Sequence, residues 1–120
     1  MALTQICCVG LGYVGLPTAA ALAESGVDVH GCDVNEDIVA SLKQGRCHIA
    51  ERSLEDIVNQ VIAKGTLSVG TAPVKADVFI IAVPTPLRAD KQPDLSYVTS
   101  AIESIIPLLE PDNLVILEST

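Results

Sequence analysis

The feature that most constrains the fold of this 120-residue chain is a glycine pattern near its start. Gly10, Gly12 and Gly15 form the pattern G-x-G-x-x-G, between an apolar run at 5–9 and an alanine-rich stretch. In a strand–turn–helix context, the first glycine permits a tight turn and the second lets a pyrophosphate approach the backbone. The third lets the helix pack closely against the strand. The pattern therefore predicts a unit that binds a dinucleotide.

The rest of the chain alternates between predicted strands and helices. Hydrophobic residues make up 49% of the chain but aromatic residues only 2%, which is typical of aliphatic strands buried on both faces of a sheet. The alternation predicts an α/β fold, a Rossmann-type doubly wound parallel sheet in one domain over residues 1–120. Such folds usually have six strands, so we expect this chain to be the N-terminal fragment of a longer protein. The five predicted strands are 5–9, 27–32, 66–69, 77–83 and 113–117, and the four helices are 13–25, 35–44, 53–64 and 94–109.

Two of the predicted helices have capping residues at their starts and a stripe of apolar residues along one face. Ser53 and Asp56 form a capping-box-like start, and Asp94 is expected to cap the last helix. Apolar residues at helical spacing predict the buried face of each helix. These faces comprise Leu54, Ile57, Val58, Val61 and Ile62 in the first, and Val98, Ile102, Ile105, Ile106 and Leu109 in the second.

Asp33, at the end of the second predicted strand, indicates which dinucleotide is bound. An acid about 20 residues after the glycine pattern accepts hydrogen bonds from the adenosine ribose hydroxyls. Its charge would repel the 2′-phosphate of NADP, and residues 34–37 contain no lysine or arginine. The sequence therefore predicts NAD and not NADP.

Charge and cysteine content limit the other possible partners. The net charge of −8 argues against a nucleic-acid surface, which would need a basic face. No apolar stretch reaches the roughly 18 residues of a membrane span, and no segment resembles a signal peptide. The cysteines lack metal-ligand spacing, so we expect no metal, and free thiols in a reducing cytoplasm. The cysteines are Cys7, Cys8, Cys32 and Cys47. The two histidines, His30 and His48, are expected to be structural or solvated and not catalytic.

Four sequence blocks carry a family resemblance. They are V-G-L-G-Y-V-G-L-P-T-A at 9–19, A-V-P-T-P at 82–86, P-D-L-S-Y-V at 93–98 and L-E-S-T at 117–120. In order and spacing they resemble the UDP-glucose/GDP-mannose dehydrogenase family. The stretch from Gly45 through His48 and Glu51 to the V-P-T-P block at 83–86 is most similar to the family members that act on UDP-N-acetyl-D-mannosamine.

The resemblance implies an enzyme that oxidises the primary alcohol of a UDP-sugar to a carboxylate with two NAD per turnover. The family's catalytic cysteine and lysine would lie beyond this chain, and its members are homo-oligomers at full length. The resemblance also implies roles for single residues. Leu11, Tyr13 and Val14 match positions at the pyrophosphate, Pro84 and Thr85 match the nicotinamide end, and Thr120 matches a threonine beside the hydrolytic water, with Glu118 and Ser119 as weaker candidates.

The resemblance has one departure, and other functions stay open. Many relatives carry a basic residue a few positions after the ribose acid, where this chain has Asp37. The substrate could instead be UDP-glucose or UDP-N-acetylglucosamine. A different NAD dehydrogenase, such as a 3-hydroxyacid enzyme, shares the glycine pattern, as does an NAD-sensing regulatory domain that switches a partner protein. The regulatory domain does not need the blocks at 83–86 and 117–120.

Overall fold

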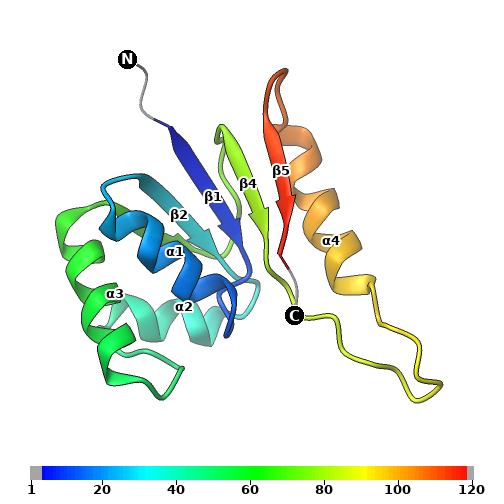
Figure 1. The fold of residues 1–120 in the computed structure, drawn as a ribbon, viewed down its shortest axis with the longest axis horizontal. Coiled ribbons are helices and arrows are strands. Elements are labelled where there is room, and N and C mark those ends of the chain that lie inside the picture. Colours follow the sequence, from blue (N-terminus) through cyan, green and yellow to red (C-terminus); the bar gives the residue numbers. More distant parts are fainter. Residues whose placement is uncertain (1–3, 119–120) are drawn as a thin grey trace.

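One parallel sheet organises the chain, whose computed structural model describes residues 4–118. Its strands lie in the order β3-β2-β1-β4-β5 (Figure 1). Strands β2 and β3 are added on one side of β1, and strands β4 and β5 are added on its other side. The topological switch point therefore lies between β1 and β4, and the predicted doubly wound parallel sheet is confirmed. The strands are β1 (Gln5–Val9), β2 (Asp28–Cys32), β3 (Leu67–Gly70), β4 (Val78–Ile81) and β5 (Leu114–Leu117).

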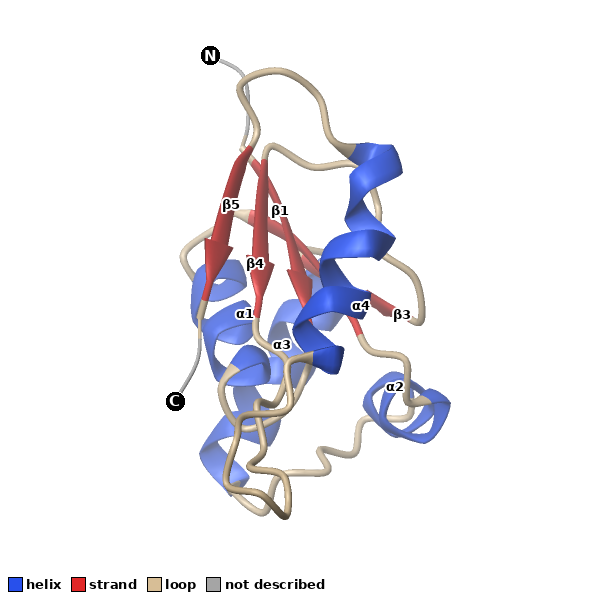
Figure 2. Cartoon of the chain, turned by 90° about the vertical axis from the view of Figure 1, so that its right-hand side faces the viewer, coloured by secondary structure: helices blue, strands red, loops and turns tan. Residues whose placement is uncertain are grey.

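Helices cover both faces of the sheet. Helices α1 and α3 pack on one face and α4 packs on the other (Figure 2). Within residues 4–118, no helix is long and apolar enough to cross a membrane. The helices are α1 (Gly15–Glu24), α2 (Glu36–Lys43), α3 (Arg52–Lys64) and α4 (Ser96–Ile105), which a 3₁₀ turn (Ile106–Leu108) extends.

Alternate residues of each strand enter two separate cores. In β1, Ile6 and Cys8 face the larger core under α1 and α3, whereas Cys7 and Val9 face the smaller core under α4. Phe79 of β4 is fully buried in the smaller core. Because both faces are covered at the centre of the sheet, β1 and β4 are almost entirely apolar, as the composition predicted.

The start of α3 differs from the prediction. The N-cap residue is Glu51 and the helix begins at Arg52, so Ser53 lies inside the first turn and the predicted capping box is wrong. The Ser53 hydroxyl donates instead to Glu51 Oε1 over 3.1 Å. The predicted buried face of this helix is confirmed: Leu54, Val58 and Val61 are buried, with Ile57 and Ile62 half-buried against the same core.

Helix α4 buries a different face from the one predicted. Of its predicted stripe only Ile105 is buried, and Ile102, Ile106 and Leu109 are exposed. The small Ala101 takes the central contact, because a short side chain lets the helix approach the sheet. The helix also ends at Ile105, where the 3₁₀ turn containing Pro107 changes the direction of the side chains that follow.

Asp94 lies just before α4 and interacts with its first residue. Its Oδ1 accepts hydrogen bonds from the Ser96 N–H over 3.0 Å and from the Ser96 hydroxyl over 2.6 Å. These bonds to Ser96 lower the pKa of the Asp94 carboxyl. The N-cap position is occupied by Leu95, so the prediction that Asp94 caps this helix is wrong; Asp94 lies one residue earlier and binds the first helical N–H.

Candidate functional site

The glycine turn joins the carboxyl end of β1 to α1, and two of its glycines are required by packing. Gly10 has a φ of 103°, and a Cβ there would lie 2.5 Å from the carbonyl oxygen of Ala82. A Cβ on Gly15 would lie 1.8 Å from the carbonyl oxygen of Gly10. Both contacts are with backbone atoms, so no side-chain movement can relieve them. These two glycines bring α1 close to the switch point, as the pattern predicted.

Gly12 differs from the other two glycines of the turn. A Cβ at this position would meet no atom within 4 Å. The fold therefore does not require a glycine here, but a ligand lying close to the backbone would. In addition, α1 starts at its N-cap residue Val14 without a cap from any described side chain, which suits an anion at the helix N-terminus. This arrangement fits a pyrophosphate.

Asp33 connects the end of β2 to the glycine turn. Its Oδ2 accepts the backbone N–H of Leu11 and its Oδ1 accepts that of Asn35, both over 2.9 Å. Each carboxylate oxygen has a further lone pair, so the half-buried Asp33 can still accept hydrogen bonds from a ribose. Asp37 lies four residues on, in the first turn of α2, and is exposed.

A hollow of about 430 Å³ lies beside the glycine turn. It brings together residues from three of the four sequence blocks, including Pro84 and Thr85 after β4. The predicted Ser119 and Thr120 lie outside the described residues. The lining comprises Gly12, Tyr13, Val14, Ala82, Val83, Pro84, Thr85, Pro86 and Glu118.

Leu11 does not line this hollow. Its side chain is fully buried and fills the space above Gly31, where a Cβ would lie 2.7 Å from Leu11 Cδ2. Only the Leu11 backbone belongs to the turn. Its N–H is held by Asp33, and its carbonyl accepts a 2.6 Å hydrogen bond from His48 Nε2.

His48 is a contact of the turn that the sequence did not reveal. It was expected to be structural, but nothing in the sequence indicated that it reaches Leu11, 37 positions away. Because a carbonyl can only accept, Nε2 of His48 carries a proton and donates it to this bond. The Leu11 peptide group is thus held from both sides, by Asp33 and by His48.

Replacing His48 with alanine is expected to lower the free energy of unfolding by about 1 kcal/mol, the net worth of one ordinary hydrogen bond. His48→Gln should retain most of this stability, because its side-chain amide can donate to the same carbonyl. Urea unfolding of both variants measures the difference. Equal losses in the two variants would show that the imidazole ring packs the turn and that the hydrogen bond is unimportant.

The cysteines are free thiols, as expected. Cys8 lies beneath the glycine turn, where its Sγ is 3.6 Å from the Gly15 carbonyl oxygen. Burial, with a smaller effect from Glu118, raises the pKa of the Cys8 thiol to about 12. Contact with the Cys7 thiol and burial also raise the pKa of Cys32. Cys8 and Cys32 are therefore protonated structural residues. Among residues 4–118, no group of three or more His, Cys, Asp or Glu side chains could hold a metal ion.

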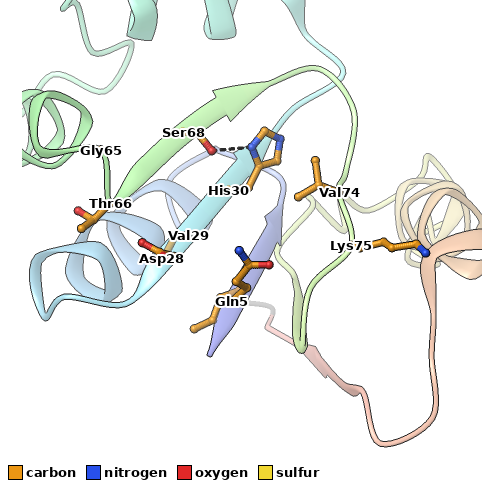
Figure 3. A pocket seen from close by; sticks show the side chains of 10 residues that line it. Gln5, Asp28, Val29, His30, Gly65, Thr66, Ser68, Val74 and Lys75 are labelled. Carbon is orange, nitrogen blue, oxygen red and sulfur yellow. Dashed lines mark hydrogen bonds between the residues drawn. The ribbon is translucent and has the colours of Figure 1, made fainter. Parts of the chain in front are cut away.

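A second hollow, of about 360 Å³, lies around the amino-terminal halves of β1 and β2 and the start of β3 (Figure 3). His30 projects into it, and both of its ring nitrogens are engaged. Nδ1 accepts the hydroxyl of Ser68 over 2.8 Å, and Nε2 donates to the Ala72 carbonyl over 3.1 Å. These contacts fasten the 71–75 loop to the sheet, in accord with a structural histidine. Ligands of open α/β sheets bind at the carboxyl ends of the strands, so we place the site in the other hollow.

Known proteins share this arrangement. The sequence profile of the UDP-glucose/GDP-mannose dehydrogenase family, NAD binding domain, matches residues 4–120. A UDP-N-acetyl-D-mannosamine dehydrogenase from Salmonella typhi is 47% identical over 120 residues, which are 100% of this chain and 29% of that enzyme. An NDP-N-acetyl-D-galactosaminuronic acid dehydrogenase from Ralstonia nicotianae is 49% identical over 93% of the chain and 26% of its own length.

A solved structure agrees with these sequence matches. The UDP-N-acetyl-mannosamine dehydrogenase of Staphylococcus aureus superposes on 98% of this chain with a TM-score of 0.94 and 44% identity, and the chain covers 29% of it. This chain thus spans under a third of the length of these relatives. The matched domain is the NAD-binding domain of its family, and NAD is its cofactor.

Proposed function

Since this chain belongs to the UDP-glucose/GDP-mannose dehydrogenase family, we propose that residues 1–120 are the NAD-binding domain of an enzyme that oxidises a UDP-sugar. The observation that carries the proposal is the open space over Gly12 at the switch point, next to Asp33 and the 82–86 segment. Within residues 4–118, neither a steric contact nor a positive φ requires a glycine at this position.

The order of the strands supports a position for each part of NAD along the carboxyl edge of the sheet. Asp33 follows β2, so the adenosine ribose lies over that strand. The pyrophosphate lies against Gly12 and the start of α1, next to β1. An extended dinucleotide then places its nicotinamide over β4, at Pro84 and Thr85. Asp33, the glycine turn, Pro84 and Thr85 would bind and orient NAD, which would supply the hydride acceptor for the reaction.

The proposed substrate is UDP-N-acetyl-D-mannosamine, oxidised to UDP-N-acetyl-D-mannosaminuronate with two NAD for surface polysaccharide synthesis. The names of the relatives from Salmonella typhi and Staphylococcus aureus support this choice. The catalytic cysteine and lysine, and the contacts that make a homo-oligomer, are expected beyond Thr120, so residues 1–120 alone should be inactive. The free thiols are consistent with a cytoplasmic enzyme.

The test is NADH production by the full-length protein with UDP-N-acetylmannosamine, UDP-N-acetylglucosamine and UDP-glucose offered separately. We expect turnover of the first, with two NADH formed per sugar. Preference for another of these sugars would retain the reaction and replace the substrate. Binding of NAD without turnover of any UDP-sugar would favour the regulatory function instead.

A further inference from the structure

Glu118 is the first residue after β5, and its carboxylate is held at the edge of the hollow. Its backbone N–H donates to the Ile81 carbonyl of β4 over 2.8 Å, which continues the sheet by one residue. Its Oε1 accepts the Thr18 hydroxyl of α1 over 2.8 Å. The side chain is half-buried. A strand and a helix that meet at the switch point thus fix its position.

Glu118 is also the only charged side chain among the described residues that line this hollow. The other lining residues are glycine, apolar residues, Tyr13 and Thr85. A fixed negative charge in largely apolar surroundings acts over a longer distance than the same charge in water. The charge of Glu118 therefore acts on any ligand group bound in the hollow near residues 82–86.

Resting on the proposed function, which puts the nicotinamide at Pro84 and Thr85, we propose that Glu118 selects the oxidised over the reduced cofactor. The oxidised nicotinamide ring carries one positive charge and the reduced ring carries none. A carboxylate several ångströms away therefore stabilises bound NAD⁺ and leaves NADH almost unaffected. Because Glu118 is half-exposed, water screens the interaction. At about 6 Å and an effective dielectric constant of about 40–80, the difference is on the order of three- to tenfold in affinity. In an enzyme that uses two NAD per sugar, this preference favours the replacement of bound NADH by NAD⁺.

The test measures the dissociation constants of NAD⁺ and NADH on the full-length protein without sugar, by isothermal titration calorimetry. Glu118→Gln keeps an oxygen that can accept the Thr18 hydroxyl but removes the charge. It is expected to weaken NAD⁺ binding about three- to tenfold and to change NADH binding less than about twofold. Glu118→Ser removes the charge with a different shape and should give the same shift. Glu118→Asp keeps the charge and should bind the two cofactors in nearly the native ratio.

Glu110→Gln is the matched control for overall charge. Glu110 is exposed, pairs with Lys75 over 3.3 Å, and precedes β5 at the opposite end of that strand from Glu118. This variant loses the same charge and should not change the affinity ratio. A native ratio in both Glu118→Gln and Glu118→Ser, or an equal shift in Glu118→Asp, would overturn the inference and leave the proposed function intact. Failure of the native protein to bind either cofactor would instead overturn the proposed function.

Discussion

Replacing Gly12 with alanine is expected to weaken NAD binding by about 100-fold, or about 2.7 kcal/mol, while leaving the fold as stable as before. The new methyl group would enter space that the protein leaves open, where the pyrophosphate approaches the backbone. Because the methyl meets no protein atom within 4 Å, the free energy of unfolding should be unchanged or slightly higher. Calorimetric titration with NAD and urea unfolding measure the two quantities on the same variant.

Gly15→Ala provides the matched control, since it makes the same chemical change three residues away. Its Cβ would lie 1.8 Å from the Gly10 carbonyl oxygen and 3.2 Å from Ala82 Cβ. We expect a loss of about 3 kcal/mol in unfolding free energy, because α1 would have to move away from β1. A Gly12→Ala variant that is as unstable as Gly15→Ala would mean that the turn has no room for a ligand. One that binds NAD as tightly as the native protein would mean that the pyrophosphate lies elsewhere.

The fold was predictable because its signals are local. The central strands β1 and β4 are short apolar segments. Helices α2 and α3 each end where a glycine with positive φ, Gly45 or Gly65, follows within two residues. The right-handed crossover rule then limits the possible strand orders. The buried face of α4 was not predictable in this way. Ala101 is buried because α4 lies close to the sheet, where only a small side chain fits. The periodicity of the sequence instead predicted that the larger residues, such as Ile102 and Ile106, would be buried.

The site was predictable only in part, for the same reason. The glycine pattern and Asp33 have a spacing that reflects one βαβ unit, so the contact between Asp33 and the turn follows from the pattern. The contacts of His48 with Leu11 and of Thr18 with Glu118 join segments with no such relation. They depend on how loops and strand ends meet in three dimensions. The sequence alone could suggest Glu118 as a candidate, but not which residue holds it.

Asp33→Asn is expected to reduce the preference for NAD over NADP by about 100-fold. The carboxylate has two acceptor oxygens, and both also hold backbone N–H groups, those of Leu11 and Asn35. An asparagine offers one acceptor, so one N–H loses its partner and the unfolding free energy should fall by about 1–2 kcal/mol. The larger effect is on binding. NAD loses hydrogen bonds from its ribose, whereas the 2′-phosphate of NADP is freed from a repelling charge.

Asp37→Asn shows whether this effect belongs to Asp33 or to acidic residues in general. Asp37 is exposed at the start of α2, and none of the hydrogen bonds in residues 4–118 involves its side chain. Removing its charge should change the ratio of the NADP and NAD dissociation constants by less than about threefold, because exposed charges are strongly screened. If Asp33→Asn and Asp37→Asn shifted this ratio equally, the 2′-phosphate of NADP would be repelled by the combined negative charge around the adenosine site and not by Asp33 in particular. Only a large shift confined to Asp33→Asn would identify this carboxylate as the group that meets the ribose.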